Sequence, residues 1–355
     1  MTVYTLRIMR NKEIVRKVQL MGGSTLIISL PKEWTKKAGI NPGDFVYLHV
    51  ESDTSLRVMP KNIVSLRRRE TVINVGKEIS KGALVRELMS RYLTGYKVIV
   101  LNFHDGDYKQ RKYLKSIISK KLIGVEVLEE SSNRMVLQVL VNVEELTVNT
   151  IIQRMTYVAS GMLSDSLREL KKLDKEVIQD IIDRDDIADK LYLYILRQLN
   201  AAIKGYLKLE EIGLKSIEET LQYGIVAKGI ERVADHAQRI AMNLLELSQL
   251  NFSFKENLCK AIYEYGSSIN RIFGDSVTAF LTRNRNEAHN IIDTAAESLK
   301  GYEKTIVNHM MNFELSAKTY FPLRLIIDSL RRIVDYSIDI SEATLDLTTE
   351  LYEAI

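Results

Sequence analysis

The sequence has little cysteine and lacks long apolar runs. Its 355 residues include a single cysteine, Cys259, which excludes an internal disulfide framework and any cysteine-based zinc site. The longest apolar runs, 97–103 and 135–143, last fewer than ten residues, whereas a membrane span needs about 20. The N-terminus carries charges every few residues and has no apolar core of signal-peptide length. We therefore expect a cytoplasmic protein without membrane insertion.

Proline is also scarce and unevenly placed. Pro31, Pro42 and Pro60 fall in the first 60 residues, and only Pro322 follows. Because proline breaks helices, this distribution predicts a small β-rich front part and a long helical remainder.

Nucleophilic and acid/base motifs are missing as well. The chain has no GxSxG, no HExxH and no GxxxxGK[ST] sequence. The lone cysteine lies in an apolar helical context typical of a core residue. We therefore predict a protein that is not an enzyme.

Charge is divided along the chain. The net charge is +4 overall, with +5 over residues 1–61, +5 over residues 62–150 and −6 over residues 151–355. A basic front part and an acidic rear part suggest that the front part faces a polyanion.

Residues 1–61 are predicted to form a β-rich domain. Residues 14–20 and 25–30 are rich in β-branched side chains and flank a glycine turn, and two further strands are expected at 45–51 and 55–59. A short helix should span 32–38 and end at Gly39. Such a unit is too small to bury much core alone.

Residues 62–146 alternate strand and helix signals. Their order, β-α-β-α-β-β, predicts a small α+β domain with its helices on one face of a sheet. No functional motif stands out in this segment.

Residues 147–355 are predicted to be all helical. Apolar residues recur three and four apart, and breaks in the pattern define six helices of roughly 25–40 residues. The helices divide into two repeats, 147–250 and 251–355, because Arg232 and Asp235 match Arg332 and Asp335 at an offset of 100 residues. We expect tandem three-helix bundles.

The first repeat carries acidic pairs at helical spacing. Asp185 and Asp189 share one face of the second helix, and Glu231 and Asp235 share one face of the third. Two such pairs that meet would offer hard oxygen ligands. The alternative is an acidic, solvated helix face, as pairs of this spacing usually are.

The second repeat keeps less of this pattern. Asp293 and Asp335 occupy the matching positions, and Asp339 and His289 lie close enough in sequence to assist. Arg331 replaces the expected glutamate, so that it either repels a cation or pairs with Asp335.

Basic residues surround the glycine turn of the first domain. Such side chains neutralise phosphates of a nucleic-acid backbone and can read base edges, although a solvated basic face is the simpler alternative. The residues in question are Arg16, Lys17, Lys32, Lys36 and Lys37.

Residues 13–61 resemble a SpoVT-AbrB swapped-hairpin domain. The resemblance is carried by the stretch ISLPKEWTKKAGINPGD at 28–44. It implies that two chains exchange hairpins to form one dimeric β-barrel that binds DNA. It also implies that Ser24 lies in the DNA-facing turn, at a position where the family commonly has a basic residue.

Residues 147–355 resemble PhoU, the phosphate-uptake regulator built from two three-helix repeats. The stretch ERVADHAQRIA at 231–241 carries the match. The resemblance implies metal binding at the acidic pairs, with iron, manganese, magnesium or zinc as candidates, and a role as adaptor to phosphate transporters. Together with the AbrB-like head, the chain resembles archaeal PhoU-type regulators.

Three functions follow from these patterns. The first is a homodimeric DNA-binding regulator of phosphate homeostasis whose bundle senses a metal or a partner. The second is an adaptor that docks on a phosphate transporter or a signalling kinase, with the head serving only dimerisation. The third, a di-metal carboxylate enzyme, needs a bridging histidine and an open pocket, and the sequence indicates neither.

Overall fold

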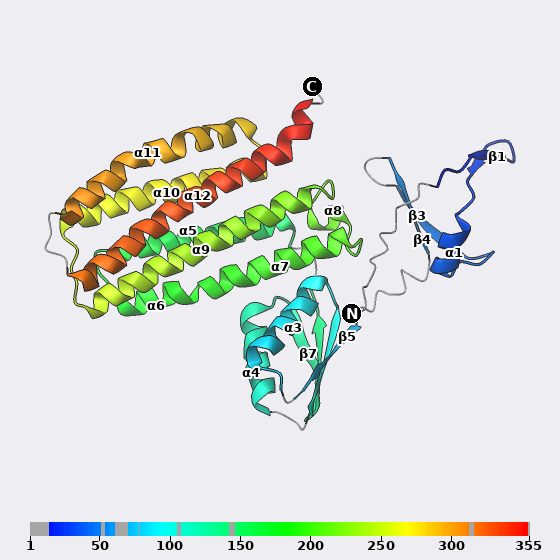
Figure 1. The fold of residues 1–355 in the computed structure, drawn as a ribbon, viewed down its shortest axis with the longest axis horizontal. Helices are drawn as coiled ribbons and strands as arrows, with labels where there is room; N and C mark the ends of the chain where they lie inside the picture. The colour runs from blue at the N-terminus through cyan, green and yellow to red at the C-terminus, as the bar shows by residue number, and fades with distance from the viewer. Residues whose placement is uncertain are drawn as a thin grey trace, which may run out of the picture. The chain divides into compact units, whose positions relative to one another are not determined.

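The computed structural model of the chain describes residues 14–50, 54–60, 70–76, 78–104, 108–141, 146–311 and 316–353. The chain divides into two compact units, Met1–Arg68 and Arg69–Ile355. The second unit holds both the α+β segment and the helices (Figure 1). These two parts, which the sequence separates at residue 146, therefore form one body.

The first unit, called the head below, contains two strand pairs and one short helix. Strands β1 and β2 pair antiparallel, as do β3 and β4, and α1 lies between the two pairs in sequence. The elements are β1 (Gln19–Met21), β2 (Thr25–Ile27), α1 (Lys32–Ala38), β3 (Val46–Val50) and β4 (Leu56–Pro60). Each pair is a separate two-stranded sheet, so the barrel implied by the resemblance is not closed within the described part of one chain.

Turn chemistry explains the outline of the head. Gly22 and Gly23 have φ values of 63° and 86°, which only glycine adopts at little cost, and they link β1 to β2. Gly39 takes the left-handed conformation and ends α1, as predicted. The first strand is shorter than expected, because pairing begins only at Gln19.

The α+β layer of the second unit has the predicted order. Strands β5 and β6 are parallel, and β8 and β7 follow antiparallel, so the sheet order is β5-β6-β8-β7. Figure 1 shows α3 and α4 together on one side of this sheet. The elements are β5 (Glu70–Val75), α3 (Lys81–Thr94), β6 (Val98–Phe103), α4 (Tyr108–Lys121), β7 (Val125–Glu130) and β8 (Arg134–Val139).

From residue 148 onward the described chain is helical. The predicted second helix is two helices, α6 and α7, divided at Arg184, and a short α8 precedes the third long helix. The elements are α5 (Val148–Glu169), α6 (Lys175–Asp183), α7 (Asp185–Ile203), α8 (Leu209–Ile212), α9 (Glu219–Gln249), α10 (Glu256–Thr282), α11 (Arg285–Met311) and α12 (Ala317–Glu353). None of the described helices is long and apolar enough to cross a membrane.

The helices pack as two groups of three. Helices α5, α6–α7 and α9 contact one another, and so do α10, α11 and α12. Helix α9 lies along α12 over the most extensive contact in the molecule, visible in Figure 1. A side chain at Gly229 would place its Cβ 3.2 Å from Ile340, so the glycine allows this close approach.

The duplication is visible in burial as well as in sequence. From residue 232 to residue 245 of α9, the order of buried, half-buried and exposed positions repeats at 332–345 of α12. Equivalent residues therefore face equivalent environments, which supports the two predicted repeats.

Helix α7 attaches the α+β layer to the bundle. Arg197 of α7 donates to the carbonyl oxygens of Tyr92 and Tyr96 at the end of α3, and Lys190 donates to the carbonyl of Ser119 in α4 at 2.7 Å. Cations from α7 thus bind carbonyls at the ends of both layer helices, where the helix dipoles favour positive charge.

Candidate metal centre

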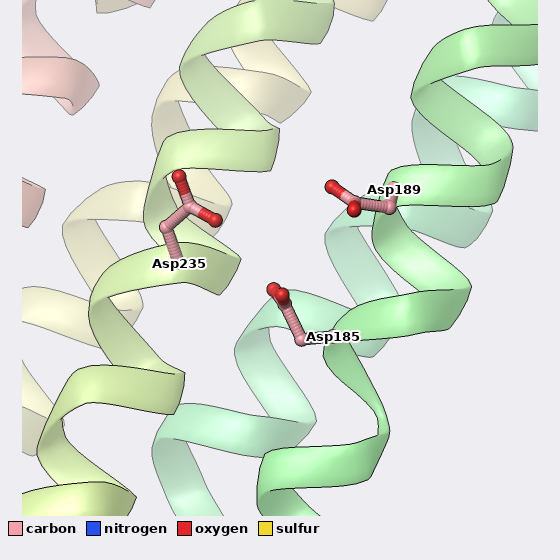
Figure 2. Close-up of side chains that lie close together, drawn as sticks. All are labelled: Asp185, Asp189 and Asp235. Carbon is pink, nitrogen blue, oxygen red and sulfur yellow. The ribbon is translucent and has the colours of Figure 1, made fainter. Parts of the chain in front are cut away.

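Three aspartates of the first repeat converge between α7 and α9. One carboxylate oxygen of each of Asp185, Asp189 and Asp235 lies within 4.8 Å of the other two. Figure 2 shows Asp185 and Asp189 on successive turns of α7, pointing toward Asp235 on α9. These three residues are called the carboxylate cluster below.

Local structure places Asp185 at the first position of α7. The preceding Arg184 binds Asp180 and Asp165, with nitrogen–oxygen distances of 2.5 Å to each, and holds the junction of α6 with α5. Asp189 then follows one turn later on the same face. The backbone N–H groups at the start of α7 stabilise negative charge there.

The electrostatics of the carboxylate cluster favour a bound cation or proton. Burial, followed by the charges of Asp189 and Asp235, raises the pKa of Asp185 to about 7. Burial also raises the pKa of Asp235. The Oδ1 atom of Asp185 is buried and has no hydrogen-bond partner in the described structure. An unpaired buried acceptor of this kind is costly without a ligand.

Lys121 supplies a cation from the α+β layer. Its Nζ lies 2.9 Å from Oδ2 of Asp189, although the two residues are 68 positions apart and belong to α4 and α7. This bond with Asp189 raises the pKa of Lys121 despite its partial burial. Sequence reasoning missed Lys121, because no local pattern connects the end of α4 with α7.

Glu231, the fourth predicted ligand, forms an ion pair with Lys228. Lys228 Nζ lies 2.6 and 2.5 Å from its two carboxylate oxygens. Glu231 is buried, which raises its pKa, whereas the bond with Lys228 opposes that rise. Glu231 therefore stands beside the three aspartates with its charge already neutralised. The i, i+3 spacing of Lys228 and Glu231 could have indicated this pair.

The second repeat does not bring its acids together. Among the described residues, Asp293, Asp335 and Asp339 belong to no cluster of potential ligands. Asp293 and Asp339 are exposed. The arginine that pairs with Asp335 is Arg332, at 2.7 Å, which corrects the expectation of a pair with Arg331.

The donor set of the carboxylate cluster fits a hard cation. Three carboxylates are the ligands that magnesium, manganese and iron prefer, and zinc also accepts carboxylate oxygens. Without a cation, the structure reduces the repulsion by the Lys121 bond and by the raised pKa of Asp185. The described histidine nearest in sequence, His236, has a pKa lowered to about 4 by burial and by Arg239, Arg332 and Arg232. It lies on the side of α9 that faces α12.

The predicted DNA-binding residues all lie on the surface of the head. Each of the six is exposed in the single chain: Arg16, Lys17, Ser24, Lys32, Lys36 and Lys37. Arg16 and Lys17 precede β1, Ser24 follows the glycine turn, and the other three belong to α1. Lys36 and Lys37 occupy the last turn of α1.

Comparison with known families finds a similarity in each of two parts of the chain. The PhoU domain profile matches residues 152–244, which contain all four predicted ligands of the first repeat. The profile described as "Antidote-toxin recognition MazE, bacterial antitoxin" matches residues 19–64. The chain thus combines a PhoU-like helical region, a mixed middle layer and a small MazE/AbrB-like strand region. The more specific archaeal type stays a prediction.

Curated relatives resemble the helical region. The "Phosphate-specific transport system accessory protein PhoU homolog" of Clostridium acetobutylicum is 26% identical over 214 residues, covering 59% of this chain and 93% of that protein. The "Phosphate-specific transport system accessory protein PhoU homolog 1" of Thermotoga maritima is 22% identical over 209 residues, covering 58% and 88%.

Solved structures of PhoU proteins are also similar to the chain. PhoU from Pseudomonas aeruginosa matches with a TM-score of 0.47 and 16% identity, covering 57% of this chain and 96% of that chain. The phosphate transport system regulatory protein PhoU from Streptococcus pneumoniae matches with a TM-score of 0.48 and 20% identity, covering 57% and 94%.

Proposed function

We propose that this chain is a homodimeric, DNA-binding regulator of phosphate uptake, and not an enzyme, whose helical region senses a metal ion. One observation carries the proposal: a MazE/AbrB-like head and a PhoU-like region with three convergent aspartates occur in a single chain. The link to phosphate comes from the named function of the curated relatives.

The metal ion is assigned to Asp185, Asp189 and Asp235. Glu231 is the fourth candidate ligand, because it is buried beside them and needs only to release Lys228. Iron, manganese, magnesium and zinc are the candidate ions. Binding would supply positive charge, so Asp185 would lose its proton and Lys121 would lose its bond with Asp189.

Metal binding at Asp189 would change a contact between α4 and α7, because Lys121 binds the same carboxylate. Lys121 is the last residue of α4, so competition for Asp189 acts directly on the α+β layer, the segment that follows the head in the chain. In this proposal a change at the carboxylate cluster reaches the α+β layer, which comes after the head in the sequence.

Dimerisation is proposed from the surface of the head. Of its described residues only Pro60 is buried, while several large apolar side chains are more than 60% exposed, namely Val15, Leu20, Met21, Leu26, Phe45, Leu48 and Val50. Exposed apolar surface on this scale marks a contact with a partner. The proposed partner is a second head, with which the first exchanges hairpins. Symmetric DNA half-sites follow from a symmetric dimer.

Metal content tests the cation site. Purified full-length protein should contain close to one equivalent of iron, manganese, zinc or magnesium per chain by elemental analysis. Asp189→Ala and Asp235→Ala should each lose most of it, whereas Asp293→Ala, the matched change in the second repeat, should keep it. If both first-repeat variants keep their full metal content, Asp189 and Asp235 are not the metal ligands.

DNA binding is tested with the region upstream of the protein's own gene. Fluorescence anisotropy at rising salt should show tighter binding to this DNA than to a shuffled duplex. The double variant Arg16→Ala with Lys17→Ala should weaken binding, and Arg271→Ala with Lys318→Ala, an equal loss of charge in the bundle, should not. Equal affinity for both duplexes at every salt concentration would rule out the proposal of a sequence-specific regulator.

A second candidate function is an adaptor without DNA binding. It is favoured by the relatives' description as accessory proteins of a phosphate transport system. In that case the head serves only dimerisation. Co-purification of the full-length chain with a phosphate transporter or a signalling kinase, together with absent DNA binding, would support the adaptor over the regulator.

A further inference from the structure

A cavity of about 640 Å³ opens between α9 and α12, beside the carboxylate cluster. Three arginines line it: Arg232 and Arg239 from α9 and Arg332 from α12. The guanidinium groups of Arg232 and Arg332 lie 5.5 and 5.0 Å from the centre of the Tyr336 ring, so the same tyrosine contacts both cations. We call this space the arginine cavity.

Acidic groups near the arginine cavity are already engaged, and one of them is bound to a cavity arginine. Asp328 is bound to Arg324 at 2.8 Å, and Asp335 is bound to Arg332 at 2.7 Å. Asp235 lines the cavity but its carboxylate points to the carboxylate cluster (Figure 2). Asp335 thus neutralises Arg332, whereas no ion pair joins Arg232 or Arg239 to an acidic group of the described chain, so two guanidinium groups of the arginine cavity keep their charge.

The wall of the arginine cavity also contains buried polar side chains. His236 and Asn243 are 9% exposed and Ser329 is 5% exposed. The Nδ1 atom of His236 is buried without a hydrogen-bond partner in the described structure. A buried polar atom that borders a cavity and lacks a protein partner leaves a place for a water molecule, an ion or a ligand.

The internal repeat supplies a comparison. A cavity of about 540 Å³ on the other side of the α9–α12 contact is lined in part by the equivalent positions of the opposite repeat. Where the arginine cavity has Arg239, Ser329 and Asp328, this second cavity has Asp339, Gly229 and Lys228. Three guanidinium groups therefore line the arginine cavity, whereas Arg232 is the one guanidinium group among the lining residues of the second cavity.

We propose that the arginine cavity binds a small phosphate-bearing anion. Guanidinium groups recognise phosphate oxygens through paired N–H donors, and the two without an acidic partner, Arg232 and Arg239, match a multiply charged anion better than a monocarboxylate. The volume is that of ordinary small-molecule sites. Inorganic phosphate and a phosphorylated metabolite share this chemistry. The proposal does not require a metal ion at the carboxylate cluster.

Calorimetric titration of the full-length protein tests the proposal. The protein is first treated with a chelator, so that failure of the metal proposal leaves this result unchanged. Inorganic phosphate and a nucleoside monophosphate are titrated separately at constant ionic strength, with chloride as the background anion. Saturable binding of at least one of them is expected, and the tighter one identifies the source of the phosphate group.

Variants locate the site. Arg239→Gln should weaken binding at least about tenfold, because it removes charge-assisted hydrogen bonds, and Arg239→Lys should restore part of it. Arg154→Gln, an equal loss of charge on the exposed face of α5, should bind as the unaltered protein does. The proposal is overturned if neither anion binds saturably, or if Arg239→Gln and Arg154→Gln bind equally well.

Discussion

Lys121, the last residue of α4, donates a hydrogen bond to Asp189 of α7 at 2.9 Å and so ties the α+β layer to the carboxylate cluster. The same carboxylate is a proposed metal ligand. The ion pair that reaches the carboxylate cluster therefore lies at the contact between α4 and α7, where Lys120 and Asp186 form a second, longer pair at 3.9 Å. This relationship makes the proposed coupling testable at one side chain.

Replacing Lys121 with methionine should strengthen metal binding. The variant removes a positive charge that competes with the metal ion for Asp189, while the aliphatic stem is kept. Because the pair is partly exposed, we expect an increase in affinity of about fivefold. Competition with a chromophoric chelator measures it, and Lys112→Met, an exposed change on the same helix, is the control. Unchanged affinity in Lys121→Met would show that the lysine does not compete.

The metal-free protein should lose stability as the pH rises from about 4 to about 7. In the folded state the pKa of Asp185 is raised from 3.8 to about 7, so the folded state binds more protons than the unfolded state in this window. Stability is then lost as the proton leaves the folded protein. Chelator-treated protein melted at several pH values should show this slope relative to Asp185→Asn. Identical slopes would contradict the raised pKa.

Metal affinity should change with pH in the opposite direction. Asp185 must release its proton to act as a ligand, so apparent affinity should rise toward pH 7 and level off above it. Proton release measured during metal titration below pH 7 checks this. Binding that is independent of pH in that range would mean that Asp185 is not a ligand.

The head should depend on a second copy of the chain. Leu48 is 61% exposed in the single chain, and a charge at this position should oppose burial against another head. Leu48→Glu should therefore shift the full-length protein from dimer to monomer in light scattering. Leu128→Glu, at a position 53% exposed on β7, should leave the dimer intact. A dimer that persists in Leu48→Glu would place the dimer contact elsewhere.

Phosphate and metal should strengthen each other's binding. Asp235 borders both the arginine cavity and the carboxylate cluster, and a metal ion there would neutralise a charge that repels an anion. Linkage requires the same factor in both directions, and about fivefold is typical of weak coupling. Titration of metal with and without saturating phosphate measures it. Independent binding of the two ligands would contradict a shared role for Asp235.

The fold could be predicted closely because its signals are local. Gly39 ends α1 where expected, the proline distribution marks the change from strands to helices, and the acidic pairs fall on α7 and α9. The division of the second long helix at Arg184 was missed, since no helix-breaking residue marks it in the sequence.

The candidate sites could be predicted only in part. Helical spacing indicates which acidic residues share one face of a helix. It does not indicate that Lys121 of the α+β layer forms an ion pair with Asp189 of α7. The arginine cavity depends on how α9 lies against α12, and a spacing pattern within one helix carries no information on that contact. Pairwise packing of distant elements decides both features.

The affinity of the full-length protein for its own upstream DNA, with and without metal, tests the central claim most directly. Metal-loaded and chelator-treated protein are compared by anisotropy at one salt concentration, beside the Asp235→Asn variant. The account predicts that metal changes the affinity of the unaltered protein and leaves that of Asp235→Asn unchanged. Equal DNA affinity of the metal-loaded and metal-free protein would contradict it.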